Sequence, residues 1–394
     1  PGTPMGELLR RYWQPVGVAG ELRDLPKRVR LLGEDLVLFR DKQGRAGLLD
    51  LHCAHRGTSL EWGRIEEHGL RCCYHGWVYN CDGLCVEMPL EPDGYAQRRR
   101  LEQPAYPVLE FGGLIFAYMG PPGTQPLFPM YDLYDVSDGR SMLRGMKIWG
   151  DASITQVREC NWLQHYENVM DPLHLAILHT MISGPQFSGV LGALQLPHFD
   201  FEETNLGMRH HVEQHLPNGN VISRYVELAL PNILLLPSIF EKGERPVDRD
   251  KPSEVTWIVP EDDAHTTAFS IVLWPLVDGR PDPNFRPRTD TVACDDEGNE
   301  IRPGAYMQRP YEDRQRRPDD KEAQEGQRPI AIHALEHLVS SDKGVVQLRR
   351  LYKRQLNELA QGRDPIGVIR DPEQNRRVET HAWNSVSAGA LAAV

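Results

Sequence analysis

Short runs of alternating apolar and polar residues, separated by turn residues, follow one another in residues 29–122. Strands interrupted by turns at such close intervals predict a small β domain. Ahead of it, Thr3 and Pro4 read as the N-cap and first residue of a short amphipathic helix. We expect residues 1–28 to form a helical segment that packs on the larger domain further along the chain.

After the turn at Pro121-Pro122-Gly123, longer alternating segments predict a second domain over residues 123–394. The expected antiparallel strands cover Gly207 to His215, Val221 to Leu228, Val255 to Val259 and Thr267 to Trp274. Helical patterns flank these strands, so the expected fold class is α+β. Residues 278–327 are rich in Pro, Arg, Asp and Glu with little periodicity, which predicts a solvated surface loop. The alternative is that this loop shapes a pocket mouth or a subunit contact.

The chain has 394 residues, more than one hydrophobic core normally supports, which agrees with two domains. Its formal net charge of −12 argues against nucleic acid or an anionic membrane as a partner. No apolar stretch has the length of a membrane span, and the start shows no signal-peptide pattern. The chain has seven cysteines, and an odd number remains if two of them bind a metal. An odd remainder suits a reducing cytoplasm better than a disulfide scaffold.

Two cysteines and two histidines form a compact pattern, C-A-H at Cys53 and His55, then C-C-Y-H from Cys72 to His75. Each half offers a thiolate and an imidazole, the ligands of a Rieske iron-sulfur centre, in which cysteines hold one iron and histidines the other. Structural zinc also uses two Cys and two His, but zinc fingers usually group a Cys pair and then a His pair. Because Cys73 stands two residues before His75, the residues alone leave Cys72 and Cys73 open as ligands.

A second possible metal site lies at His174 and His179. Oxygen-activating non-haem Fe(II) sites use two histidines and one carboxylate on one face of the metal. Side chains five apart on a regular helix point about 140° away from each other, so we predict a π-type bulge or a break between the two. Asp171, on nearly the same face as His174, can hydrogen-bond its free ring nitrogen. Without a metal, both would be ordinary histidines of an apolar helix.

The third ligand of such a site has to be a carboxylate far along the chain. The candidates by composition are Asp319, Asp320, Glu322, Glu336 and Asp342. Asp342 stands out because it opens a stretch with the spacing of an amphipathic helix. A carboxylate in the first turn of a helix can instead serve only to complement the helix dipole.

Both patterns resemble the oxygenase (alpha) component of the Rieske non-haem iron ring-hydroxylating oxygenases, and the resemblance extends over most of the chain. It is carried by C-x-H-R-G from Cys53, R-C-x-Y-H-G-W from Arg71, and E-N-x-x-D-x-x-H-x4-H from Glu167. The region around Asp342 looks like the iron-ligand region of the phthalate-dioxygenase branch, which includes aryl O-demethylases. Cys73 departs from the family, which usually has proline there. The family implies a Rieske domain followed by a helix-grip catalytic domain.

The resemblance also implies roles for single residues. The expected ligands are Cys53, His55, Cys72 and His75 for a [2Fe-2S] cluster, and His174, His179 and Asp342 for a mononuclear iron. Glu336 is the alternative to Asp342. Asp171 would bridge His75 of one subunit to an iron-binding histidine of its neighbour, and Asn168 would lie near the iron.

By resemblance, the chain is expected to be the terminal oxygenase of a multicomponent system, acting in aromatic compound catabolism as a dioxygenase or monooxygenase. Electrons from NAD(P)H would arrive from a separate reductase, with or without a ferredoxin. A homotrimer or two stacked trimers is expected. A Rieske electron carrier without oxygenase activity is the alternative, but it would need only the β domain.

The expected substrate is an aromatic acid. O-demethylation of a lignin-derived methoxylated aromatic is favoured, with phthalate-type ring dihydroxylation or monooxygenation as the alternative. Three arginines in or near the expected pocket strands can pair with a carboxylate: Arg209, Arg224 and Arg245. An arginine on a strand can equally face solvent.

Overall fold

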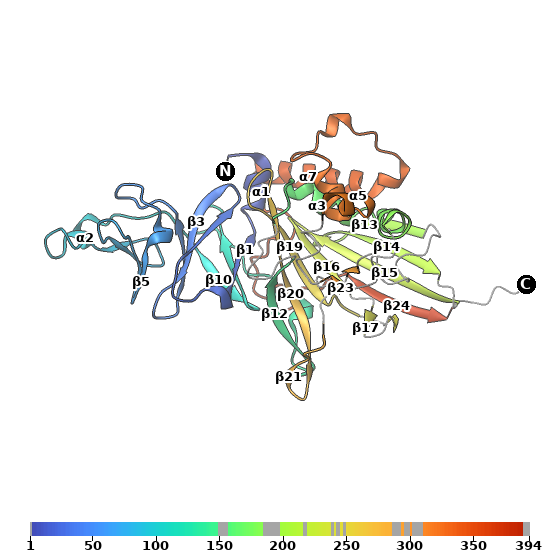
Figure 1. Ribbon diagram of the computed structural model, residues 1–394, viewed down its shortest axis with the longest axis horizontal. Helices are drawn as coiled ribbons and strands as arrows, with labels where there is room; N and C mark the ends of the chain where they lie inside the picture. The colour runs from blue at the N-terminus through green and yellow to red at the C-terminus, as the bar shows by residue number, and fades with distance from the viewer. Residues whose placement is uncertain are drawn as a thin grey trace, which may run out of the picture. The chain divides into compact units, whose positions relative to one another are not determined.

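The computed structural model describes residues 2–148, 157–183, 198–215, 219–237, 250–285 and 310–388, with short pieces at 240–241, 245–246, 293–294 and 300–301. The chain forms two compact units, shown in Figure 1. The first comprises Pro1–Pro126 and Val259–Asp262, and the second comprises Leu127–Ile258 and Asp263–Val394. The boundary after Pro126 lies close to the expected one at residue 122.

The first unit contains three small antiparallel sheets with strand orders β1-β11-β10, β2-β3-β4-β9 and β5-β6-β7-β8. Its elements are α1 Pro4–Leu9, β1 Trp13–Val18, η1 Ala19–Glu21, β2 Lys27–Leu31, β3 Glu34–Arg40, β4 Ala46–Asp50, η2 Leu60–Trp62, β5 Arg64–Glu66, β6 Gly69–Arg71, β7 Val78–Tyr79, β8 Cys85–Glu87, α2 Tyr95–Arg99, β9 Ala105–Tyr106, β10 Val108–Phe111 and β11 Leu114–Tyr118. This is the small β domain that the turn spacing predicted.

The N-terminal segment belongs to this first unit. α1 begins where expected, because the hydroxyl of Thr3 accepts a hydrogen bond from the N–H of Gly6 at 3.1 Å. The chain then continues into β1, which pairs with β11. The buried guanidinium of Arg10 donates to Glu34 of the same unit. Residues 1–28 therefore belong to the first compact unit.

The second unit is built around a nine-stranded antiparallel sheet in the order β12-β20-β19-β16-β15-β14-β13, with β24 paired to β15 and β21 to β20. Its strands are β12 Ser141–Lys147, β13 His198–Glu203, β14 Gly207–His215, β15 Asn220–Ala229, β16 Ile233–Leu236, β19 Glu254–Pro260, β20 Thr266–Val277, β21 Arg280–Pro281 and β24 Trp383–Ala388. Short two-stranded pairs are β17 Phe240–Glu241 with β18 Arg245–Pro246, and β22 Ala293–Cys294 with β23 Glu300–Ile301. The four strands predicted from the sequence correspond to β14, β15, β19 and β20.

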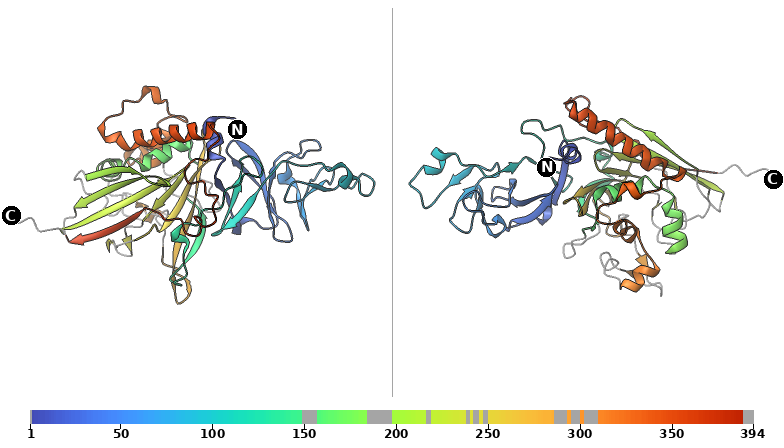
Figure 2. Two further views of the ribbon diagram at one scale, coloured as in Figure 1. Left: turned by 180° about the vertical axis from the view of Figure 1, so that it is seen from behind. Right: turned by 90° about the horizontal axis from the view of Figure 1, so that it is seen from above.

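Helices cover one face of this sheet, as Figures 1 and 2 show for α3 and α7. The helical elements of the unit are η3 Asp132–Tyr134, α3 Trp162–Val169, α4 His174–Ala176, η4 Ile177–Ile182, α5 Tyr311–Arg316, α6 Asp320–Glu325, η7 His333–Leu335, η8 Ser340–Asp342 and α7 Lys343–Ala360. Tyr166 of α3 donates to the carbonyl of Ala229, and Tyr352 of α7 donates to that of Pro231. The expected α+β arrangement is confirmed. None of the helices in the described ranges is both long and apolar enough to cross a membrane.

The expected surface loop over residues 278–327 ends in helices. Residues 286–292, 295–299 and 302–309 of it lie outside the described part of the chain. α5 and α6 follow, each with six residues, which is too short for a periodic pattern to show. The end of the expected loop is therefore helical, and α6 begins at Asp320, one of the candidate carboxylates.

Candidate metal centres

Two loops of the first unit carry the expected cluster ligands in matching turns. Cys53 follows β4, and Cys72 follows β6. In each loop the N–H of a glycine four residues later donates to the cysteine carbonyl, Gly57 to Cys53 at 2.8 Å and Gly76 to Cys72 at 3.1 Å. Both glycines have positive φ values, 74° and 75°, which residues with a side chain rarely adopt. The glycines of the two motifs therefore shape two equivalent turns.

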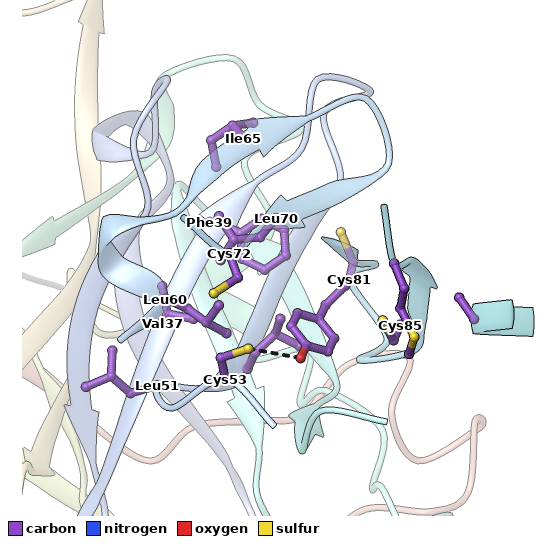
Figure 3. Packing of buried hydrophobic residues seen from close by; sticks show 14 residues of the cluster. Val37, Phe39, Leu51, Cys53, Leu60, Ile65, Leu70, Cys72, Cys81 and Cys85 are labelled. Carbon is purple, nitrogen blue, oxygen red and sulfur yellow. Dashed lines mark hydrogen bonds between the residues drawn. The ribbon is translucent and has the colours of Figure 1, made fainter. Parts of the chain in front are cut away.

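The thiols and imidazoles of these loops lie at different depths. Cys53 and Cys72 are each 3% exposed and belong to the buried core in Figure 3, whereas His55 and His75 are partly exposed. The two imidazole centroids are 4.5 Å apart, and Trp77 stacks on His55. Burial raises the pKa of Cys72, and the neighbouring Cys53 adds to this rise. A bound cation would supply the charge that such buried thiolates need.

This arrangement fits two irons better than one zinc ion. A tetrahedral zinc needs its four ligand atoms within about 4 Å of one another. Within the described ranges, the one group of three or more possible ligand atoms that all lie within 4.8 Å of one another is in the second unit. The cysteine pair and the histidine pair therefore suit the two ends of a Rieske cluster. In the second loop Cys72 is buried and Cys73 is exposed, which favours Cys72 as the ligand.

In the second unit, one ligand atom each from His174, His179 and Asp320 lies within 4.8 Å of the others. Nε2 of His179 is 3.2 Å and Nε2 of His174 is 3.5 Å from Oδ1 of Asp320. The two ring centroids are 5.4 Å apart. Two imidazoles and a carboxylate that converge in this way are the ligand set of a facial non-haem Fe(II) site.

The helix widens between the two histidines, which confirms the predicted irregularity. His174 begins α4, and His179 lies in η4, a π-helical segment. The N–H of Ser183 donates to the carbonyl of Leu178, five residues earlier, at 3.1 Å. This hydrogen-bond spacing defines a π-helix, and such segments occur often at functional sites. The wider turn lets both imidazoles reach Asp320.

The carboxylate comes from the start of α6. Asp319 caps this helix in a capping box with Glu322, so that Asp320 is the first helical residue. Burial acts to raise the pKa of Asp320, but the hydrogen bond from His179 and the charge of His174 lower it overall. Asp320 therefore stays ionised in a buried position, which suits a metal ligand. Burial and the charge of Asp320 raise the pKa of Asp319, whose carboxylate lies 3.7 Å from Nδ1 of His179.

Asn168 and Asp171 both contact this group. The amide nitrogen of Asn168 donates to Oδ1 of Asp320 at 3.2 Å and lies 3.4 Å from Nε2 of His174. The main-chain carbonyl of Asp171 accepts the hydrogen bond from Nδ1 of His174. Its carboxylate instead accepts from the N–H of Leu173 at 3.1 Å. The Asp171 contact therefore fixes the His174 tautomer as expected, but through the backbone rather than the side chain.

Asp342 and Glu336 do not join this group, which corrects the choice of third ligand. The carboxylate of Asp342 accepts from the N–H of Val339 at 2.7 Å, a local capping contact before α7. Glu336 is bound by Arg349 at 2.5 and 3.1 Å. Asp320 lies where Asp342 was expected. The signal that could have found it is the D-D-x-E capping box ahead of α6.

The three arginines considered for substrate binding have different surroundings. Arg224 is buried in the sheet at 7% exposure. Arg209 pairs with Glu202 of β13 and lies over the ring of Tyr225. The side chain of Arg245 lies outside the described part of the chain.

The two ligand sets define a class of protein, an iron-sulfur protein with a further mononuclear metal site. A family model described as the Rieske [2Fe-2S] domain matches residues 12–107. The alpha subunit of phenoxybenzoate dioxygenase from Ectopseudomonas oleovorans is 41% identical over 93% of this chain and 85% of its own length. The chain belongs to the Rieske non-haem iron oxygenases, as an oxygenase (alpha) component of the phthalate-dioxygenase-like branch, and is an oxidoreductase.

Two further relatives show how varied the named activities are. The oxygenase subunit of tert-butanol monooxygenase / tert-amyl alcohol desaturase from Aquincola tertiaricarbonis is 39% identical over 94% of this chain and 77% of its own. The 5,5'-dehydrodivanillate O-demethylase oxygenase subunit of Sphingobium sp. is 34% identical over 96% of this chain and 82% of its own. The structure of dicamba monooxygenase shares the fold with a TM-score of 0.59 and 20% identity, covering 90% of this chain and 99% of that one.

Proposed function

We propose that this chain is the terminal oxygenase that oxidises an aromatic acid with O2 and with electrons passed from NAD(P)H by a separate reductase, with or without a ferredoxin. The observation that carries the proposal is the convergence of His174, His179 and Asp320. This second ligand set favours an oxygenase over an electron carrier, which would need only the cluster loops.

The residues present fit both metal groups. When bound, the cluster supplies electrons one at a time, and the ferrous ion supplies open positions for O2. The carbonyl of Asp171 keeps the proton of His174 on Nδ1, which leaves Nε2 to bind metal. Asn168 orients the Asp320 carboxylate through its amide. The Asp171 carboxylate is then available as the proposed bridge to His75 of a neighbouring subunit.

The names of two relatives support an aryl ether acid as the substrate. Phenoxybenzoate and dehydrodivanillate are both aryl ethers with a carboxylate. We favour O-demethylation of a lignin-derived methoxylated aromatic acid, in which hydroxylation of the methoxy carbon lets formaldehyde leave. Ring dihydroxylation or monooxygenation is the second candidate, because the first of these relatives is named a dioxygenase.

Turnover of a small substrate panel with a surrogate reductase tests the proposal. The panel contains vanillate, dehydrodivanillate, phenoxybenzoate and phthalate, with tert-butanol as the non-aromatic comparison. Formaldehyde released in proportion to O2 consumed is expected from a methoxylated acid. A ring diol without formaldehyde would favour dihydroxylation, whereas oxidation of tert-butanol alone would contradict an aromatic substrate.

We also infer a head-to-tail homotrimer, or two stacked trimers. The first unit exposes 58% of Tyr74, which directly precedes His75, and 71% of Trp62, which lies between the two ligand motifs in sequence. The second unit exposes 60% of Leu335 and 65% of Val339. We infer that these side chains lie at subunit contacts, because heterologous contacts between two different surfaces can close into rings. A native mass near one chain of 44.9 kDa would contradict this assembly.

A further inference from the structure

His210 of β14 is buried but has no role in either metal centre. It is 4% exposed, and its Nδ1 has no hydrogen-bond partner in the part of the chain that the structure describes. A buried polar atom without a partner costs free energy, and most such atoms in native proteins are paired. A position of this kind calls for a ligand.

His210 points to the face of the sheet that the helices cover. Its directly opposed residue on β13 is Phe201, and opposed residues of an antiparallel pair lie on the same face. A Cβ at Gly344 of α7 would lie 2.3 Å from the Phe201 ring and 2.6 Å from the carbonyl of Met170. Phe201 therefore lies between the sheet and the helices. His210 shares this face.

One permanent cation, Arg224, acts on His210. Burial, with smaller contributions from Arg224, His174 and His211, lowers the pKa of His210 to about 3. His210 is opposed by Val226, two residues from Arg224 on β15, so Arg224 lies diagonally across on the same face. His174 is one of the proposed iron ligands. The imidazole therefore stays neutral and can donate one hydrogen bond on the face that also carries the Arg224 guanidinium.

A neutral donor on the same face as a buried guanidinium matches an anionic oxygen. We propose that His210 binds substrate, donating a hydrogen bond to the carboxylate of an aromatic acid held between the sheet and the iron ligands. The inference rests on the proposed function and deepens it, because it names the substrate group that the site recognises. Charge-assisted hydrogen bonds to carboxylates are stronger than neutral ones, so this contact selects acids over neutral analogues.

A matched pair of variants on one strand tests the role of His210. His210→Phe removes the donor, and His211→Phe changes the next residue, which faces the other side and stacks on Tyr225. Binding of phenoxybenzoate and of its carboxamide to the holoenzyme is measured by titration calorimetry without O2. His210→Phe should weaken phenoxybenzoate about 10- to 100-fold and leave the carboxamide unchanged. His211→Phe should match the wild type for both.

Iron content and the Rieske paramagnetic signal report whether each variant is intact. His210→Gln retains a donor and should recover part of the affinity for the acid. If His210→Phe loses iron, the acid affinity of His210→Gln is compared with that of the wild type instead. Unchanged acid binding, or equal weakening of acid and carboxamide, overturns the role of His210. Turnover of an acid by the wild type upholds the proposed function in either case, whereas a wild type that binds no acid overturns both.

Discussion

The main-chain carbonyl of Asp171, and not its carboxylate, accepts the hydrogen bond from Nδ1 of His174. Orientation of the proposed iron ligand is therefore independent of the Asp171 side chain, whose proposed role is to bridge to His75 of a neighbouring subunit. Asp171→Asn keeps the carbonyl and an oxygen that can cap Leu173. We expect both metals to stay bound while product formation falls about 10- to 100-fold or more. Retained coupled turnover would count against the bridge.

The third iron ligand can be tested with two aspartates in one experiment. Asp320→Ala removes the carboxylate that lies 3.2 Å from His179, whereas Asp342→Ala removes only a local cap. Iron analysis should fall from about three to about two atoms per chain in the first variant and stay at about three in the second. The Rieske signal should persist in both. The reverse result would restore Asp342 as the ligand.

The hydroxyl of Tyr79 lies 3.1 Å from Sγ of Cys53, as the dashed line in Figure 3 marks. Burial and the contact with Cys53 raise the pKa of Tyr79, so the hydroxyl stays protonated and donates to a bound thiolate. This bond favours the reduced cluster, which carries more negative charge. Tyr79→Phe should lower the reduction potential by on the order of 50 mV in a redox titration.

A tyrosine of the same unit serves as the control. The hydroxyl of Tyr106 donates to Glu34 and not to a cluster ligand. Tyr106→Phe should leave the potential unchanged. Equal potentials in the wild type and the Tyr79→Phe variant would show that this hydroxyl does not tune the cluster.

Arg349 binds both carboxylate oxygens of Glu167, at 2.5 and 2.6 Å, and Glu167 is 8% exposed. Arg349→Met would leave a buried carboxylate without its cation, which costs about 3–5 kcal/mol of unfolding free energy. Urea denaturation measures the loss. Burial already raises the pKa of Glu167, so the variant should regain stability as pH falls and this carboxylate takes up a proton.

An exposed ion pair provides the comparison for Arg349. Arg363 and Glu358 form a surface pair in which both side chains remain in solvent. Arg363→Ala should change the unfolding free energy by less than about 1 kcal/mol. Adding Glu167→Gln to Arg349→Met should recover part of the loss. No recovery would place the instability elsewhere.

Features set by local sequence were predictable. The proposed cluster ligands can be recognised as two short motifs, and the π-helical turn follows from the spacing of His174 and His179 together with the geometry of a helix. The four long strands were recognisable by their alternation. In each case the neighbours along the chain determine the structure.

Features set by the tertiary fold were not predictable. Asp320 reaches the histidines from a six-residue helix, and periodicity cannot show so short a helix. The sequence could place Asp171 near His174 but could not distinguish its carbonyl from its carboxylate. The assignment of residues 1–28 depended on the pairing of β1 with β11, a contact between distant segments.

A single turnover of reduced enzyme shows whether electrons from the cluster drive oxidation of substrate at the proposed iron site. Holoenzyme is reduced, freed of reductant and reductase, and mixed once with O2 and a phenoxybenzoate or methoxylated acid that it binds. We expect oxidation of the cluster together with product in the wild type, and no product from Asp320→Ala. Equal product from Asp320→Ala, or an oxidised cluster without product from any aromatic acid in the wild type, would contradict it.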